Sequence, residues 1–121
     1  MNALIELEEW KPTAARLDRS GPEKFKVGNA LVDRRTGRVE RPGSVARLRA
    51  KELELLLHLY QNSTMTFTRQ QLLHDVWNFA ATLMTRTVDQ TVATLRKTIE
   101  SDPDQPQFLQ TVYGVGYRLV L

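Results

Sequence analysis

The chain has 121 residues, of which 41% are hydrophobic, a formal net charge of +3 and no cysteine. This length supports one hydrophobic core rather than two domains, and the absence of cysteine excludes disulfides and thiolate metal sites. No apolar run approaches the roughly 18 residues of a membrane span, and the acidic N-terminus (Glu6, Glu8, Glu9) lacks the features of a secretion signal. The sequence therefore signals neither export nor membrane insertion and predicts a cytoplasmic location.

Residues 1–22 show no sustained hydrophobic period, and Lys11-Pro12 and Gly21-Pro22 interrupt them. We predict a linker or flexible tail over residues 1–22 and a single domain over residues 23–121.

The next segment consists of short pieces separated by turn residues at Gly28-Asn29, Thr36-Gly37 and Pro42-Gly43. We expect strands at Lys24–Val27, Ala30–Asp33, Arg38–Glu40 and Ser44–Leu48. Strands this short are not stable alone, so we predict a small antiparallel sheet that packs on a helix.

The same segment carries most of the positive charge. Nine bases lie between Lys24 and Lys51 against Asp33 and Glu40, a local charge of +7, whereas five bases and five acids cancel from Met65 onward. Three interpretations stay open: a sheet edge protected by charge, a docking face for an acidic partner such as a receiver domain, or direct contact with a polyanion.

Three helices are predicted downstream. The first spans Ala50–Gln61 and has a wide leucine-rich face; the second begins after a brief strand at Met65–Phe67 and is capped by Thr68. The third opens near Thr85 and ends at Ile99. At helical spacing this third helix has a stripe of residues to be buried, Val88, Val92, Leu95 and Ile99, and a polar stripe, Arg86, Gln90, Thr94 and Lys97.

The chain ends in a predicted hairpin that pairs Gln107–Val112 with Tyr117–Leu121. Gly114 and Gly116 are interpreted as turn residues that permit positive φ, because no helix follows them as it would in a phosphate-binding loop. Two helices followed by a terminal hairpin form the plan of a winged helix-turn-helix. The predicted fold class is therefore α+β: an N-terminal four-stranded antiparallel sheet, three helices and a C-terminal hairpin wing.

Four motifs occur in the order and spacing of a known family. They are Thr68-Arg-Gln-Gln-Leu-Leu-His-Asp-Val-Trp77, Arg86-Thr-Val-Asp89, Leu95-Arg-Lys97 and Thr111-Val-Tyr-Gly-Val-Gly-Tyr-Arg118. Over roughly Phe25 to Leu119 the chain resembles the OmpR/PhoB family of response-regulator effector domains. The resemblance implies regulation of transcription in a two-component system, with the third helix in the DNA major groove and the wing at the adjacent minor groove.

The resemblance also implies individual contacts and partners. Phosphates would be held by Arg86, Arg96 and Lys97, with further backbone contacts from Trp77, Thr87, Thr111, Tyr113 and Tyr117. Gln90, Thr91 and Thr94 would face the bases. The loop containing Asn78, Phe79, Thr82 and Leu83 would contact RNA polymerase. Subunits would pair in tandem on direct repeats, and a receiver domain of roughly 100 residues would belong to a longer parent chain, unless the chain is a free-standing regulator.

Several positions depart from the family. Ala93, Thr94 and Tyr113 stand where many members carry bases, which predicts weaker affinity, a preference for A·T-containing sites or reliance on the wing. The alternative is a protein-interaction module that has lost DNA recognition. Leu48-Arg49 replaces a Thr N-cap, so the first helix must be capped differently or fray.

Two alternatives to these functions concern charged and titratable side chains. Arg86 or Arg96 could pair with Asp89 or Glu100 on the same helix instead of with phosphates. His58 and His74 are isolated in sequence, without a zinc-binding or nucleophile motif. We therefore expect no catalytic residue, no metal site and no cofactor.

Overall fold

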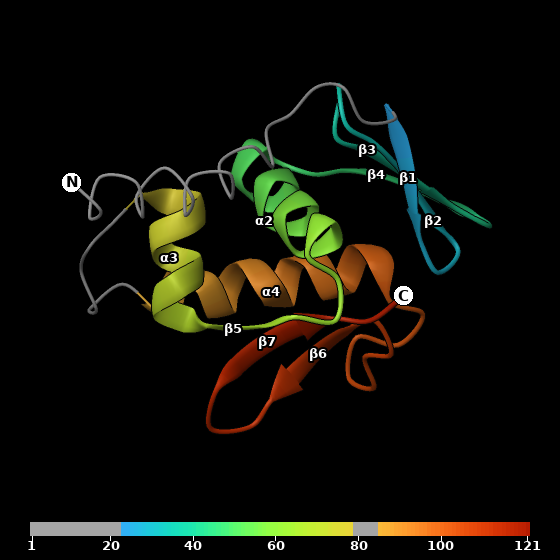
Figure 1. Ribbon diagram of the computed structural model, residues 1–121. Coiled ribbons are helices and arrows are strands. Elements are labelled where there is room, and N and C mark those ends of the chain that lie inside the picture. Colours follow the sequence, from blue (N-terminus) through green and yellow to red (C-terminus); the bar gives the residue numbers. More distant parts are fainter. Residues whose placement is uncertain (1–22, 79–84) are drawn as a thin grey trace.

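The structure, a computed structural model, describes residues 23–78 and 85–121. Figure 1 shows a four-stranded sheet and a smaller sheet on different sides of a group of three helices. Within the described residues the elements are, in chain order, β1 (Lys24–Val27), β2 (Ala30–Asp33), β3 (Arg38–Arg41), β4 (Ser44–Arg47), α2 (Ala50–Gln61), β5 (Thr66–Thr68), α3 (Arg69–Trp77), α4 (Thr85–Ile99), β6 (Leu109–Val112) and β7 (Gly116–Leu119). The predicted fold class is confirmed. The predicted linker, residues 1–22, lies outside the described residues.

The first sheet is an antiparallel meander in the order β1-β2-β3-β4. Phe25, Val27 and Val32 alternate with exposed or half-buried residues and face the core. The sheet packs on α2 through the rings of Phe25 and Tyr60, whose centroids lie 4.4 Å apart. β4 ends at Arg47 and not at the predicted Leu48, because Leu48 turns into the core.

The starts of α2 and α3 are capped in different ways. The backbone N–H of Arg49 donates to Glu52 Oε1 at 2.8 Å, so a first-turn carboxylate serves α2 in place of a Thr cap. At α3 the cap is reciprocal: Gln71 N donates to Thr68 Oγ1 at 3.0 Å, and Thr68 N donates to Gln71 Oε1 at 2.8 Å. The predicted cap at Thr68 is confirmed. Of the two expectations for the start of α2, a different cap or fraying, the structure shows the different cap.

The second sheet has the order β5-β7-β6 and contains the terminal hairpin. Gly114 at the hairpin turn has φ +78°, as predicted. For Gly116 the prediction was wrong, because its φ is not positive. Gly116 is required for a different reason, because the backbone of β5 lies too close for any side chain: a Cβ at this position would overlap the carbonyl oxygen of Phe67.

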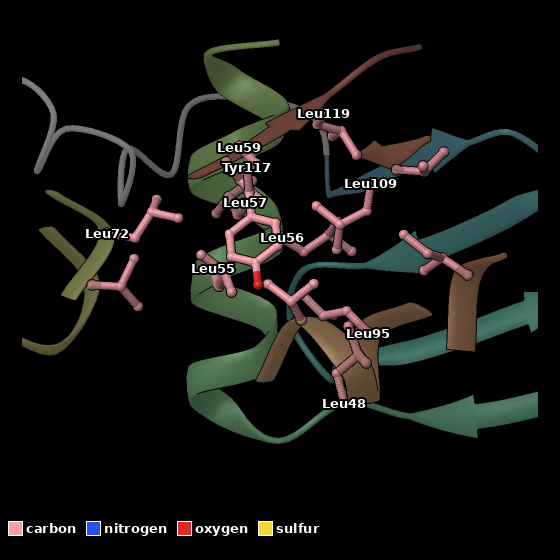
Figure 2. Packing of buried hydrophobic residues seen from close by; sticks show 14 of the residues in the cluster. Leu48, Leu55, Leu56, Leu57, Leu59, Leu72, Leu95, Leu109, Tyr117 and Leu119 are labelled. Carbon is pink, nitrogen blue, oxygen red and sulfur yellow. The ribbon is translucent and has the colours of Figure 1, made fainter. Parts of the chain in front are cut away.

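The hydrophobic core lies where the three helices and both sheets meet. Figure 2 shows leucines of α2 close to Leu72 of α3, Leu95 of α4, and Leu109 and Leu119 of the hairpin, with the Tyr117 ring among them. Since α4 contributes one whole stripe to this core, its opposite stripe is held toward solvent.

One buried carboxylate fixes the hairpin to the end of α4. Glu100 is 1% exposed, and its Oε1 accepts from Gln107 N at 2.7 Å while Oε2 accepts from Phe108 N at 3.0 Å and Leu109 N at 2.7 Å. Backbone donors that satisfy a buried carboxylate offset its loss of hydration. The wing therefore starts at a defined position relative to α4.

Candidate nucleic-acid interface

The polar stripe of α4 is exposed along its length. Val88, Val92, Leu95 and Ile99 are buried, whereas Arg86, Gln90, Ala93, Thr94 and Lys97 are exposed. The predicted division of the helix into two faces is confirmed. In Figure 1 α4 runs beneath α2, with the β6–β7 hairpin on its other side.

The cations at the two ends of this face are available to a ligand. Arg86 and Lys97 are eleven positions apart, which is about 16 Å along a helix. Within residues 23–78 and 85–121, neither side chain makes a hydrogen bond or an ion pair. Their charges are therefore free to meet phosphates on either side of a groove.

Threonine hydroxyls on α4 donate to its own backbone. Thr91 Oγ1 donates to the carbonyl of Thr87 at 2.9 Å, and Thr94 Oγ1 donates to that of Gln90 at 3.2 Å. Thr87 and Thr91 are half-buried, but Thr94 is exposed. A hydroxyl whose hydrogen is used in this way keeps only its acceptor capacity toward an outside partner.

Arg96 joins α4 to the hairpin. Its Nε donates to the carbonyl of Leu109 at 2.9 Å and its Nη2 to Thr111 Oγ1 at 2.8 Å, and the guanidinium carbon lies 5.7 Å from the centroid of the Tyr117 ring. The alternative in which Arg96 pairs with Asp89 or Glu100 was wrong. The phosphate contact predicted for Arg96 and the backbone contact predicted for Thr111 stay predictions.

Asp89 on α4 accepts hydrogen bonds from side chains of α3 and β7. Arg69 donates to it through Nε at 3.1 Å and Nη2 at 2.6 Å, and the Tyr117 hydroxyl donates to Oδ1 at 2.7 Å. Burial and then the bond to Asp89 raise the pKa of Tyr117 to about 12. Tyr117 is 8% exposed, so its predicted DNA contact stays a prediction for a side chain that already has an internal partner.

The tip of the wing is uncharged and projects into solvent. Tyr113 is 90% exposed and Val115 is 48% exposed. The tip therefore offers an aromatic ring and an apolar side chain, and no charge, to a ligand.

Trp77, the last residue of α3, is half-buried against the core. Asn78 terminates the helix in a left-handed conformation, with φ 62°, and its N–H donates to the carbonyl of His74 at 3.0 Å. Phe79, Thr82 and Leu83 of the predicted polymerase-contacting loop lie outside the described residues.

Several bases between Lys24 and Lys51 have intramolecular partners. Arg35 pairs with Glu23 at 3.3 Å, Arg38 with Glu40 at 3.0 Å and Lys51 with Glu54 at 3.3 Å. Arg41 Nη1 donates to the carbonyl of Glu100 at 2.6 Å, where a cation also complements the negative end of α4. The positive charge of this segment is thus partly used within the molecule.

His58, which has no motif partner in the sequence, has a partner in the folded structure. His58 Nε2 lies 3.1 Å from Asp75 Oδ2, and His58 is 0% and Asp75 3% exposed. This pair joins α2 to α3 inside the core, where no substrate has access. Among the described residues no cluster of three or more acidic or histidine side chains is placed to bind a metal.

The sequence of the chain matches a family of known proteins. Residues 43–119 match the family described as "Transcriptional regulatory protein, C terminal". The chain belongs to this family. The family consists of DNA-binding transcription-regulator domains and is not an enzyme family, and the OmpR/PhoB resemblance of the motifs is confirmed.

The family includes response regulators of mycobacteria and streptomycetes. The chain is 36% identical over 107 residues to the DNA-binding response regulator MtrA of Mycolicibacterium smegmatis, covering 86% of this chain and 47% of MtrA. It is 36% identical over 104 residues to the transcriptional regulatory protein AfsQ1 of Streptomyces coelicolor, covering 86% of this chain and 46% of AfsQ1. The chain thus spans about half the length of these curated relatives.

Solved structures of family members have the same fold. The response regulator DrrB of Thermotoga maritima, an OmpR/PhoB homolog, is similar with a TM-score of 0.70 and 32% identity, over 100% of this chain and 54% of DrrB. The DNA-binding domain of the response regulator AdeR, solved in complex with an intercistronic region, has a TM-score of 0.60 and 32% identity, over 79% of this chain and 96% of that domain. In the part of this family member that the structure describes, no helix is both long enough and apolar enough to cross a bilayer.

Proposed function

We propose that this chain binds duplex DNA through α4 and the β6–β7 wing and regulates transcription as the effector domain of a two-component response regulator. The observation that carries the proposal is the exposed face of α4, on which Gln90 and Thr94 lie between the two cations Arg86 and Lys97. Such a face meets both requirements of a DNA-binding helix, namely charge for phosphates and hydrogen-bonding groups for bases.

In this proposal Arg86 and Lys97 hold phosphates on either side of the major groove. Arg96 has Nη1 left for a phosphate after its bonds to the hairpin, and Thr87, Thr111 and Tyr113 border the same face. Gln90, Thr91 and Thr94 face the bases, and Trp77 and Tyr117 contact the DNA backbone. DNA bound to the AdeR domain agrees with duplex DNA as the ligand class.

The remaining partners follow from the same assignment. Residues 23–121 would form the DNA-binding domain, preceded by a linker over residues 1–22 and, in a longer parent chain, by a receiver domain. Two such domains would bind in tandem to direct repeats, and the loop from Asn78 through Leu83 would contact RNA polymerase. A regulator of this kind works in the cytoplasm, where the DNA is.

The competing hypothesis is a protein-interaction module that kept the fold and lost DNA recognition. Salt dependence separates the two, because each neutralised phosphate adds a counterion-release contribution to the binding constant. Fluorescence anisotropy with duplexes selected from genomic DNA should give a log affinity that falls steeply with log salt concentration.

The Arg86→Ala variant should make this salt slope shallower by about 0.9. Lys26→Ala removes an equally exposed base from the four-stranded sheet and serves as the matched control with an unchanged slope. Absence of binding at about 50 mM salt, where phosphate contacts are strong, would refute the proposal and support the interaction module.

A further inference from the structure

The base-facing part of α4 has an unusual composition for a surface that contacts DNA. Between Arg86 and Lys97 the exposed positions on this face are Gln90, Ala93 and Thr94, and none of them is charged. Arginine or lysine paired with the O6 and N7 atoms of guanine is the commonest specific contact in the major groove. The central turn of this helix cannot make that contact.

The conformation of Thr94 further restricts which bases the central turn of α4 can contact. Its hydroxyl hydrogen is directed to the carbonyl of Gln90, with Oγ1 and O 3.2 Å apart. The hydroxyl therefore has no hydrogen left for the acceptors of guanine, and it presents lone pairs and its γ-methyl group to the outside. The γ-methyl group of Thr94 and the methyl group of Ala93 together form a small apolar surface of the kind that contacts the C5-methyl group of thymine.

Gln90 supplies the complementary contact. A carboxamide pairs with adenine through one donor and one acceptor, at N6 and N7. Gln90 and Thr94 are four residues apart, about 6 Å along the helix axis, which is close to two base-pair steps of about 3.4 Å each. Both side chains can therefore contact base pairs of one half-site that lie about two steps apart.

The two arginines near the central turn are each held in place by intramolecular hydrogen bonds, so we assign neither of them a guanine contact. Arg69 is held by both oxygens of Asp89, and Arg96 is held by β6. This leaves Arg86 and Lys97, which stand at the two ends of the helix and flank the central turn.

We infer that α4 selects half-sites whose central base pairs are A·T, with thymine methyl groups against Ala93 and Thr94 and an adenine against Gln90. This inference rests on the proposed function and specifies the DNA that the same surface recognises. It assigns base discrimination to methyl contacts at Thr94 and to the carboxamide of Gln90.

The test replaces thymine by deoxyuridine, which lacks only the C5-methyl group. Duplexes enriched from a random pool are resynthesised with one thymine at a time changed to deoxyuridine, and their affinities are measured at constant salt. Loss of one buried methyl contact should weaken binding about fourfold at the contacted position, and replacements outside the half-site should have no effect.

Two variants of Thr94 assign the contact to its methyl group. Thr94→Ser keeps the hydroxyl and removes the methyl group, so it should weaken binding to the thymine duplex about fourfold and should have no further effect on the deoxyuridine duplex. Thr94→Val keeps a methyl group at the same position, so its affinity for the thymine duplex should still exceed that for the deoxyuridine duplex by about fourfold. The fold of each variant is checked by circular dichroism.

Three results would overturn the inference while leaving the proposed function intact: enriched sites with G·C pairs at their centre, equal affinity for thymine and deoxyuridine duplexes, or a preference for the thymine duplex that is lost in Thr94→Val as it is in Thr94→Ser. In each of these three cases the protein would still bind duplex DNA, with an affinity that depends on salt concentration. Failure to bind any duplex at low salt would instead overturn the proposed function, and the inference with it.

Discussion

The four-stranded sheet and the α4–wing unit differ in how much positive charge they carry and in what surrounds it. The segment from Lys24 to Lys51 has nine bases, but Arg35, Arg38 and Lys51 are in ion pairs and Arg41 is bonded to the end of α4. The second half of the chain has no net charge, yet it holds two exposed, unengaged cations on one face of α4. Lys26 and Arg47 on the sheet are likewise exposed and make no ion pair with any residue that the structure describes. The proposed DNA-binding surface therefore differs from the sheet not in free charge but in holding Gln90 and Thr94, which can contact bases, between its two cations.

The two regions also differ in how they are stabilised. Ion pairs on the sheet are exposed, and such pairs contribute about 0 to 1 kcal/mol each. In the α4–wing unit Glu100 and Arg96 make buried or half-buried hydrogen bonds to the backbone, which have larger effects when one partner is lost. The proposed binding surface, which requires a fixed relation between helix and wing, contains the second kind of contact.

The largest expected effect is on stability. Glu100→Ala leaves the amides of Gln107, Phe108 and Leu109 without their acceptor and should lower the free energy of unfolding by about 3 kcal/mol. Glu40→Ala removes the exposed partner of Arg38 and should change it by less than about 0.5 kcal/mol. Urea denaturation measures both variants, and equal effects would contradict the contrast between the two regions.

DNA affinity should show the same contrast. Arg86→Ala combined with Lys97→Ala should raise the dissociation constant about 10- to 100-fold at physiological salt, because two phosphate contacts are lost. Lys24→Ala combined with Lys26→Ala removes the same charge from the sheet and should change it less than about twofold. A larger loss in the sheet variant would favour direct contact of the basic segment with a polyanion.

Arg41 is the point where the two regions are connected, since it donates from β3 to the carbonyl of Glu100 at 2.6 Å. Arg41→Ala should lower the free energy of unfolding by about 1 to 2 kcal/mol and speed amide hydrogen exchange at the end of α4. Arg47→Ala, on the exposed strand β4, is the control and should stay within about 0.5 kcal/mol. If the two variants behave alike, Arg41 has no special role in holding α4.

The smallest expected effect is at alkaline pH. The pKa of Tyr117 is raised from 10.0 to about 12, so the unfolded chain loses this proton at a lower pH than the folded protein. The stabilisation is complete below pH 10 and is lost as pH rises toward 12. The free energy of unfolding should fall by on the order of 1 kcal/mol more in the parent protein than in Tyr117→Phe, and identical pH profiles would contradict the assignment.

Local features of the sequence predicted most of the fold. Turn residues such as Gly28 and Gly43 mark the ends of short strands, and the hydrophobic stripe of α4 sets which face is buried. These signals act between residues close in sequence. The strand ends at Leu48 and Met65 were misplaced by single residues, where tertiary packing decides the boundary.

Contacts between distant residues could not be predicted in the same way. The bond from Arg96 to the backbone carbonyl of Leu109 joins residues thirteen positions apart, and a backbone carbonyl leaves no trace in the residue type. His58 and Asp75, seventeen residues apart, pair only because α2 and α3 pack together. The sequence therefore identified the exposed face of the candidate site but not the contacts that hold it in position.

The most direct test of the central claim is amide chemical-shift mapping by NMR during titration with a selected duplex. Our account predicts that the largest shifts occur along α4 from Arg86 to Lys97 and in the wing around Tyr113, while Lys24 and Lys26 on β1 change little. Largest shifts on the four-stranded sheet, with α4 unaffected, would contradict it.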